Sequence, residues 1–255
     1  MKLFLSNTQY IDTKQPLDLS IPLRHGSENL RAWYVDTPRF EPVRANGFLG
    51  AVNEGGSVNF RNVFFNPHGH GTHTECLGHI TPEVFSVNER VTEYICKALL
   101  LTVAPERVYN QDAQEWDEVV KKEQLDTAKF LENDIEALII RTLPNDQNKK
   151  SKNYSSTNPP YLDIDIVELL DQFNIKHLLI DVPSVDRESD GGKLVFHHRF
   201  WKVPEAPNHE RTITELIYVK DSIEDGVFLL ELQLAPFQND AAPSRPILYK
   251  LKEKK

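Results

Sequence analysis

The sequence has little of several features that mark specialised protein classes. It has two cysteines, Cys76 and Cys96, and no C-x-x-C pair. This scarcity argues against a disulfide scaffold and is typical of a reducing compartment. A basic excess is also missing, because the formal net charge is −9. We therefore expect neither nucleic acid nor an anionic membrane surface as a partner.

Long hydrophobic runs are missing too. No stretch approaches the roughly 20 apolar residues that a membrane-spanning helix needs. The opening MKLFLSNTQY has too short an apolar run for a signal peptide and lacks a small-residue cleavage site. With 40% apolar and 26% charged residues, the composition is that of an ordinary globular protein. We expect a cytoplasmic protein.

Buried strands and a helix alternate in the second half of the chain. The runs at 97–103, 137–142 and 177–182 are continuous, apolar and of strand length. Residues 162–173 carry apolar side chains at helical spacing, with an acidic first turn, which predicts a helix. Strand, loop, helix and strand together form an α/β core.

The remaining segments predict a β-rich chain. A strand and turn are expected at 10–23, and short strands and hairpins at 32–60. Further strands are expected at 61–65, 212–219, 226–237 and 246–251, and partial helix at 117–131. Residues 143–160 are polar and lack periodicity, so they form a long loop that is a lid, an inter-subunit arm or a mobile insertion. Without a repeat or a clear boundary, we expect one domain over residues 1–255, of α/β class with few helices.

Residues 66–80, NPHGHGTHTECLGHI, hold a dense group of chemically active side chains. Beside Glu75 they contain four of the nine histidines, His68, His70, His73 and His79. The interspersed glycines favour an extended or looped backbone, in which His73 and Glu75 share a face. Imidazole and carboxylate converging on one point are ligands for zinc or manganese. An adventitious metal-binding loop is the plainer alternative, and a Cys76 thiol nucleophile is another.

A second group of candidates lies downstream. Asp186, His197 and His198 follow the strand at 177–182, and functional groups in α/β proteins gather at the carboxyl ends of strands. Glu215 lies among apolar neighbours in an expected strand. A carboxylate there is costly unless it is paired or bound to metal.

With these residues in place, the chain resembles the cyclase family of metal-dependent hydrolases, whose best-known members are bacterial kynurenine formamidases. That family carries H-x-G-T-H-x-D-x-P-x-H. Residues 71–73 match its G-T-H, Glu75 stands at the aspartate and His79 at the last histidine. The segments DLSIPL near the start of this chain and PSRPILY near its end also resemble the ends of the family's sequences.

The resemblance extends downstream, with departures. Ser184, Asp186, His198 and Glu215 fit the family's S-x-D, metal histidine and strand glutamate. The family's first histidine falls on a glycine here, and either His68 or His70 substitutes for it, with His70 favoured. His197 is a rival to His198. Leu77 replaces the family's proline. These changes indicate a divergent branch.

The resemblance implies a swivelling β/β/α fold, a homodimer or higher homo-oligomer, and one or two divalent ions, zinc or manganese. His70 or His68 would hold one ion with His73 and Glu75. Glu75, His198 and Glu215 would hold the second. His79 would act as general acid and base, and Asp186 would orient a ligand imidazole.

The implied reaction is hydrolysis of an amide or cyclic amide in a small molecule, as in arylformamidases. Phe48, Phe64 and Trp201 are expected to wall the substrate pocket. The alternative is a non-catalytic metal-binding or sensing protein on the same scaffold. An enzyme should keep a substrate-sized cavity beside its metal, whereas a binding protein should close the shell of ligands.

Overall fold

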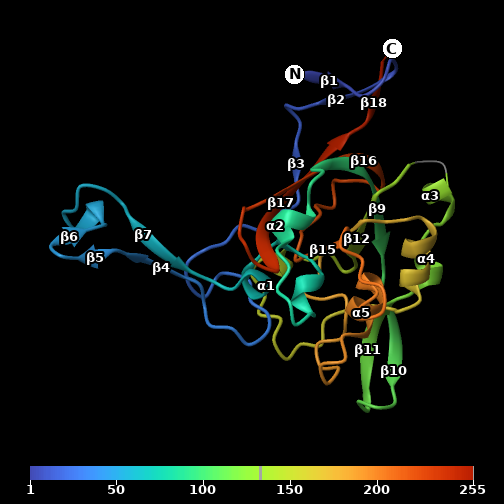
Figure 1. The fold of residues 1–255 in the computed structure, drawn as a ribbon. Helices are drawn as coiled ribbons and strands as arrows, with labels where there is room; N and C mark the ends of the chain where they lie inside the picture. Colours follow the sequence, from blue (N-terminus) through green and yellow to red (C-terminus); the bar gives the residue numbers. More distant parts are fainter. Residues whose placement is uncertain (132–133, 255) are drawn as a thin grey trace.

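The fold is built around a ring of seven strands. The computed structural model describes residues 1–131 and 134–254, and Figure 1 shows the ring at the centre of the molecule. Each strand is hydrogen-bonded to the next in the order β16 (Gly226–Leu234), β9 (Ile95–Val103), β12 (Ala137–Thr142), β14 (His177–Ile180), β15 (Thr212–Glu215), β8 (His73–Glu75) and β17 (Ala241–Lys250). A pairing of β17 with β16 closes the ring into a barrel. Its strands are mixed in direction, with β9, β12, β14 and β15 mutually parallel.

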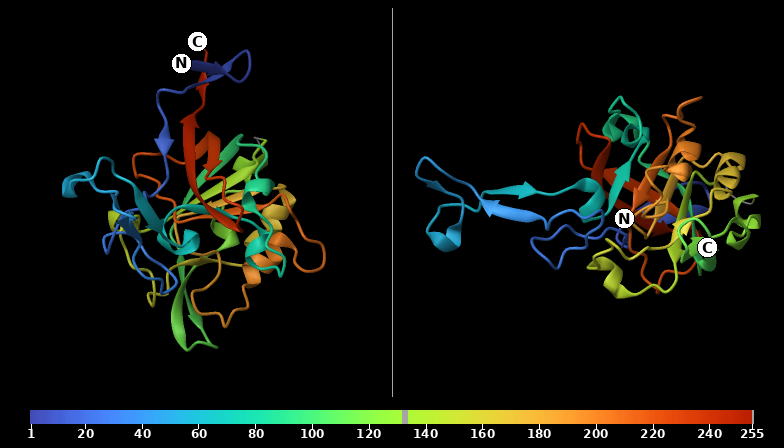
Figure 2. Two further views of the ribbon diagram at one scale, coloured as in Figure 1. Left: turned by 60° about the vertical axis from the view of Figure 1, so that its left-hand side comes forward. Right: turned by 90° about the horizontal axis from the view of Figure 1, so that it is seen from below.

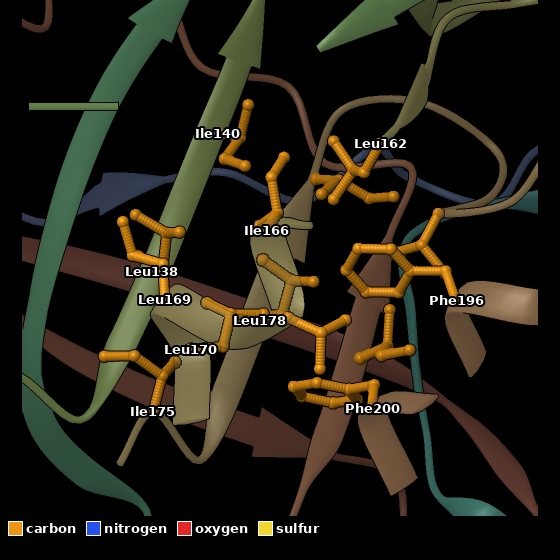
Figure 3. Close-up of a cluster of buried hydrophobic side chains, with 14 of the residues drawn as sticks. Leu138, Ile140, Leu162, Ile166, Leu169, Leu170, Ile175, Leu178, Phe196 and Phe200 are labelled. Atoms are coloured by element: carbon orange, nitrogen blue, oxygen red, sulfur yellow. The ribbon is translucent and has the colours of Figure 1, made fainter. Parts of the chain in front are cut away.

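Alternate residues of the barrel strands point to opposite sides of the wall. Ile139 of β12 belongs to a buried cluster that fills the barrel. Leu138 belongs to a second cluster, between the wall and the helices α4 (Ile166–Gln172) and α5 (Val195–Trp201), which Figure 3 shows. Each fully buried Leu, Ile or Phe stabilises the fold by about 1.5–3 kcal/mol, so both sides of the wall contribute to stability.

The predicted strands and the strand–helix–strand unit are largely confirmed. The strands expected at 97–103, 137–142 and 177–182 are β9, β12 and β14, and the last two are parallel neighbours joined through α4. The helix is shorter than predicted because Leu162 pairs in β13 (Tyr161–Leu162). The α/β class, rich in strands and poor in helices, is therefore as expected.

The partial helix predicted at 117–131 is found in the second half of the segment, whereas the first half is a strand. The segment opens in β11 (Glu115–Val120), which forms a hairpin with β10 (Glu106–Asn110), and continues through η3 (Lys122–Gln124) and α3 (Ala128–Leu131). The cross-strand contact of Tyr109 with Trp116, ring centroids 5.3 Å apart, stabilises this hairpin. Helical periodicity does not register such cross-strand pairs.

Small elements surround the barrel. The chain ends meet in a sheet of their own (Figures 1 and 2), and β3 extends β17. These outer elements are β1 (Lys2–Phe4), β2 (Gln9–Asp12), β3 (Leu17–Asp18), β18 (Lys252–Glu253), α1 (Pro67–His70), α2 (Val87–Arg90), η2 (Leu77–His79) and η4 (Gln147–Lys150). Within the described ranges, no helix has the length and apolarity to cross a bilayer.

A two-stranded arm projects from the barrel, as Figures 1 and 2 show. It comprises residues 39–64, and its stem is the antiparallel pair β4 (Arg39–Pro42) and β7 (Arg61–Phe64). Its outer part contains β5 (Arg44–Ala45), β6 (Phe48–Leu49) and η1 (Val52–Glu54).

The long loop at 143–160 is fastened to the body. Lys149 Nζ donates to Asp181 Oδ2 at 2.8 Å, at the end of β14. The backbone amides of residues 156–158 donate to the Glu188 carboxylate. The segment that projects is thus residues 39–64, not this loop.

Candidate metal centre

Strand β8 carries two site residues at the barrel wall. Glu215 of β15 lies opposite His73, and Ala241 of β17 lies opposite Glu75. His73 and Glu75 share a face because side chains alternate along a strand, and Glu215 joins them as a directly opposed residue. His73, Glu75 and Glu215 are 0%, 1% and 3% exposed, respectively. Three potential ligands are therefore buried together.

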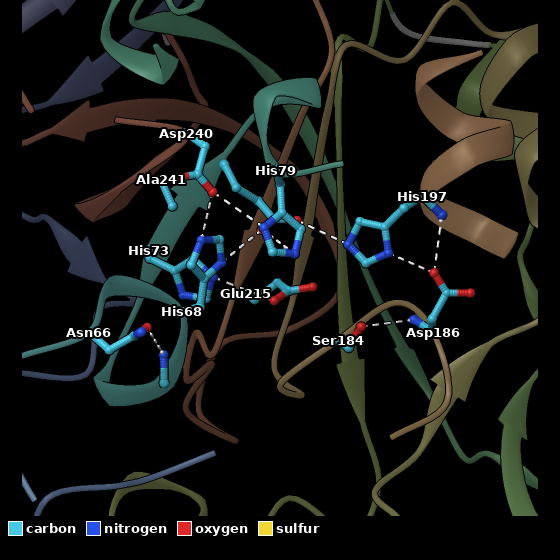
Figure 4. Close-up of polar contacts among 12 residues, drawn as sticks. Asn66, His68, His73, His79, Ser184, Asp186, His197, Glu215, Asp240 and Ala241 are labelled. Atoms are coloured by element: carbon cyan, nitrogen blue, oxygen red, sulfur yellow. Dashed lines mark hydrogen bonds and ion pairs between the residues drawn. The ribbon is translucent and has the colours of Figure 1, made fainter. Parts of the chain in front are cut away.

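Helical turns on either side of β8 add two histidines. Asn66 caps α1 by accepting from the Gly69 amide at 3.1 Å, and the turn brings His68 Nδ1 to 3.0 Å from Glu75 Oε2. After β8, η2 places His79 Nε2 3.9 Å from the same oxygen. The two rings stack with centroids 4.3 Å apart (Figure 4).

Helix α5 brings in His197. Asp186 accepts from two amides in the first turn of this helix, those of Phe196 and His197, at 2.8 and 3.1 Å. Its Oδ2 also accepts from His197 Nδ1 at 2.6 Å. His197 Nε2 then lies 3.1 Å from Glu75 Oε1. One carboxylate therefore fixes both the helix start and the ring.

The four imidazoles share one arrangement, and Figure 4 shows the contacts of three of them with Asp240 and Asp186. In each ring one nitrogen bonds an outer acceptor and the other faces Glu75 or Glu215. The outer acceptors are Gly71 O for His73 Nδ1 (3.0 Å), Asp186 for His197 Nδ1 (2.6 Å), and Asp240 for His68 Nε2 (2.8 Å) and His79 Nδ1 (3.3 Å). An oxygen that can only accept keeps a proton on the outer nitrogen, which frees the inner nitrogen for a metal.

The electrostatics of the cluster favour a cation. Burial alone would raise the pKa of Glu75, but the charge of His79 and the hydrogen bond from His197 hold it well below its ordinary value. Burial and the Glu75 charge raise the pKa of Glu215. Burial alone would lower the pKa of His68, but Asp240 and Glu75 raise it to about 10. Protons on histidines thus supply positive charge that a bound metal ion would replace.

Buried atoms that make no hydrogen bond within the described residues mark the place for that ion. His73 Nε2, Glu75 Oε2 and Glu215 Oε1 have no partner with hydrogen-bond geometry in the described part of the chain. Leaving such an atom unsatisfied costs about 1–3 kcal/mol. Ligand atoms within 4.8 Å of one another come from three sets among the described residues: His68, His73 and Glu75; Glu75, His79 and His197; and His68, His79 and Asp240. This donor set fits zinc or manganese.

A cavity of about 400 Å³ opens beside the cluster. Trp33, Val35 and Leu194 form its apolar wall, and the rest is lined by His68, His79, His197, Glu215, Asn66 and Ser184. Trp33 and Leu194 have positive φ values of 59° and 44°, a conformation that costs a non-glycine residue about 1–3 kcal/mol. The surrounding structure therefore holds this wall in place, in part through the Tyr34 hydroxyl, which donates to Glu188 at 3.1 Å.

Comparison with known proteins places the chain. The Cyclase family model matches residues 17–187, more than half of the chain. The chain belongs to the Cyclase family. The resemblance noted in the sequence is thereby confirmed.

Relatives of this cyclase-family protein align over nearly its whole length. The kynurenine formamidase of Bacillus anthracis is 27% identical over 245 residues, 96% of this chain and 99% of that protein. The kynurenine formamidase of Bacillus cytotoxicus is 26% identical over 242 residues, 94% and 97% of the two chains.

Solved structures share the fold. An isatin hydrolase bound to the product analogue thioisatinate has a TM-score of 0.63 at 14% identity, with 93% of each chain covered. A predicted metal-dependent hydrolase from Bacillus stearothermophilus has a TM-score of 0.59 at 15% identity, covering 92% of this chain and 98% of its own. The expected cyclase-like fold is confirmed.

His70, the favoured first ligand, lies outside the cluster. Its Nδ1 accepts from the Asn66 amide at 2.7 Å and its Nε2 lies 2.6 Å from Asp36 O, so both nitrogens are engaged elsewhere. Residues two apart on a helical turn point about 200° apart. His68 has the inward position, so the expected order of preference is reversed.

Gly69, where the family pattern has its first histidine, has no room for a side chain. A Cβ there would lie 2.7 Å from Val35 Cγ2 and 3.1 Å from Ala32 O. A histidine at this position would displace the backbone that carries the apolar wall. The shift of the histidine to position 68 is consistent with this packing.

His198 also lies away from the cluster. Its Nδ1 donates to Val203 O at 3.2 Å, and its side chain lines a surface hollow with Asp171 and Lys202. Successive residues on a helix point about 100° apart, so His197 and His198 cannot both face the site. The rival, His197, is the one that faces it.

The three expected pocket aromatics lie elsewhere. Phe48 is near the arm tip against Phe60, with ring centroids 5.9 Å apart. Phe64 is on the arm stem under the Arg39 guanidinium. Trp201 is buried, and its Nε1 donates to Arg211 O, so its ring supports His197 from behind. Aromatic residue type alone did not distinguish arm, core and pocket.

Sequence reasoning missed Asp240. The available signal was its position directly before the closing strand, because β17 pairs with β8 and begins beside the histidine cluster. Pairing between strands so distant in sequence is not visible from local patterns.

Cys76 has the surroundings of a structural thiol. It is fully buried in the core beneath the helices, and its Sγ donates to Phe85 O at 3.2 Å. Burial raises the pKa of this thiol to about 11. A nucleophilic thiolate would need the opposite shift, so the geometry disfavours the thiol hypothesis.

Proposed function

We propose that this cyclase-family protein is a metal-dependent hydrolase that cleaves a non-peptide amide or cyclic amide in a small molecule. The observation that carries the proposal is the common orientation of four imidazoles toward Glu75 and Glu215. The names of its relatives, kynurenine formamidase and isatin hydrolase, support an N-formyl or cyclic amide attached to an aromatic ring.

The proposed metal ligands are the inward-facing donors, namely His68, His73, Glu75, His197 and Glu215. A divalent ion, when bound, lowers the pKa of water from 15.7 to about 7 and polarises a carbonyl oxygen. Glu75 faces both groups of donors, so one or two ions can share it. The metal content of purified protein distinguishes these stoichiometries.

His79 is the proposed general acid and base. Its side chain is 31% exposed, more than the other site histidines, and it lines the cavity. Asp240 holds its Nδ1, so Nε2 can take a proton from water and return it to the leaving nitrogen. The apolar wall of Trp33, Val35 and Leu194 suits the flat, apolar part of an aryl substrate.

Metal analysis of wild type and His73→Ala tests the proposal. We expect one or two equivalents of zinc or manganese in wild type and their loss in the variant, because His73 Nε2 makes no hydrogen bond within the described residues and lies 3.4 Å from Glu215 Oε2, another proposed ligand. Exposed His25 supplies a matched control, His25→Ala, which should keep its metal. N-formyl arylamines and cyclic amides form the substrate panel.

The outcomes separate the alternatives. Absence of stoichiometric metal, even after zinc or manganese is added back, would contradict the metal-dependent mechanism. Metal without turnover of any amide in the panel would favour the non-catalytic binding protein. The cavity beside the cluster supports the enzyme.

We also propose that the protein is a homo-oligomer in which a second copy covers the arm. Phe48, Val58 and Phe60 are 42%, 49% and 58% exposed there. Two-stranded ribbons are marginally stable alone, and exposed apolar patches mark contact surfaces. Light scattering should give a dimer or larger for wild type and a smaller species for Phe48→Ser/Phe60→Ser. A wild-type monomer at all concentrations would contradict this.

A further inference from the structure

Asp240 lies between two site histidines and contacts both. Its Oδ2 is 2.8 Å from His68 Nε2 and 3.3 Å from His79 Nδ1. The two rings stack on each other, so one carboxylate oxygen joins the outer edges of a stacked pair (Figure 4). Because this oxygen can only accept, it requires a proton on each of the two nitrogens.

The backbone fixes the position of this carboxylate. The Cys76 amide donates to Asp240 O at 3.1 Å, and the next residue, Ala241, pairs with Glu75. Asp240 therefore lies at the end of β8, between the turns that carry His68 and His79. Its side chain is 17% exposed, which limits competition from water.

The geometry points to Asp240 as a positioning residue that sets the tautomers of His68 and His79 together. This inference rests on the proposed function. The protons stay on His68 Nε2 and His79 Nδ1, so the nitrogens on the side of Glu75, His68 Nδ1 and His79 Nε2, are the ones that a metal ion or a water would meet. One residue thereby prepares a metal ligand and the acid/base group at once.

The inference also explains how His68 serves as a ligand. His73 and His197 present Nε2 to the cluster, because their Nδ1 atoms bond Gly71 O and Asp186. His68 presents Nδ1 instead, and Asp240 is the group that holds its ring in this reversed orientation. Without Asp240 the ring could rotate and offer either nitrogen.

Zinc affinity of Asp240 variants tests the inference. By competition with a chromophoric chelator, we expect Asp240→Ala to weaken zinc binding about 10–100-fold, the usual effect of losing an outer partner of a ligand histidine. Asp240→Asn should lie in between, since a neutral acceptor is weaker. Asp240→Glu keeps the charge and should restore most of the affinity. Asp18→Asn, a carboxylate paired with Arg245 away from the site, should change nothing.

Nitrogen NMR of the imidazoles gives a readout that a merely structural role would not move. In zinc-loaded wild type, long-range ¹H–¹⁵N spectra should show His68 protonated at Nε2 and His79 at Nδ1. In Asp240→Asn these signals should shift or become mixtures, with kcat lowered more than KM is raised. Asp240→Asn keeps the shape of the side chain, so it can be measured even if Asp240→Ala does not fold.

Two results would overturn the inference. One is an unchanged zinc affinity and unchanged tautomers in Asp240→Asn. The other is equal loss in Asp240→Asn and Asp240→Glu, which would indicate packing rather than charge. Wild type that binds zinc without hydrolysing any amide would contradict the proposed function, while the tautomers would still decide the role of Asp240.

Discussion

Glu75→Gln should lose both the metal and the hydrolytic activity. Glu75 contacts His68 and His197 at 3.0 and 3.1 Å, and His79 at 3.9 Å, so it is the group common to the whole cluster. A neutral amide cannot replace its charge. We expect activity to fall by more than the roughly 100-fold that loss of an outer partner costs, because a proposed ligand itself is removed. Elemental analysis and kcat/KM on an N-formyl arylamine measure these effects.

The companion variants separate charge from shape. Glu75→Asp keeps the carboxylate but shortens it by one methylene, so it should retain part of the metal. Glu83→Gln removes an exposed carboxylate nearby and should match wild type. Glu75→Gln also leaves buried imidazoles without their anion, and breaking such a pair costs about 3–5 kcal/mol, so its thermal midpoint should fall. Full metal content in Glu75→Gln would refute the assignment.

Local patterns predict much of the barrel. The buried strands β9, β12 and β14 are continuous apolar runs because both sides of the barrel wall are covered, and such runs are visible without any structure. The short strands of the arm lie where strands and hairpins were expected, at 32–60 and 61–65, but the projection of the arm and the hairpin of β10 and β11 were not recognised. Both depend on cross-strand pairing, which leaves a weaker trace in the sequence than helical or buried-strand periodicity does.

The residues of the candidate site also differ in how far local sequence predicts them. His73, Glu75 and His79 lie in one short segment, so their residue types alone pointed to a shared site. The choices between His68 and His70, and between His197 and His198, depend on rotation about a helix axis. The starts of α1 and α5 decide that rotation, through Asn66 and Asp186. The position of Asp240 beside the histidines depends on the pairing of β17 with β8, two strands that are far apart in the sequence.

His197→Ala should abolish metal binding at its part of the cluster, whereas His198→Ala should leave metal content and kcat/KM within about twofold of wild type. His197 is 2% exposed and bridges Asp186 and Glu75. His198 bonds a backbone carbonyl in a surface hollow. Surface substitutions of this kind usually change stability by no more than about 0.5 kcal/mol.

This pair is a stringent test because the two variants remove the same side chain one position apart on one helix. Helix propensity and the loss of an imidazole are common to both, so a difference between them reports the direction in which each ring points. Removing His197 leaves the carboxylates of Asp186 and Glu75 without a partner, which could unfold the protein. His197→Gln keeps the bulk of the side chain and a hydrogen-bond donor, so it serves as a second variant that should stay folded. Loss of metal in His198→Ala with retention in His197→Ala would mean that α5 is rotated by about 100° from the orientation described, and that Asp186 holds the first turn of the helix without orienting a ligand.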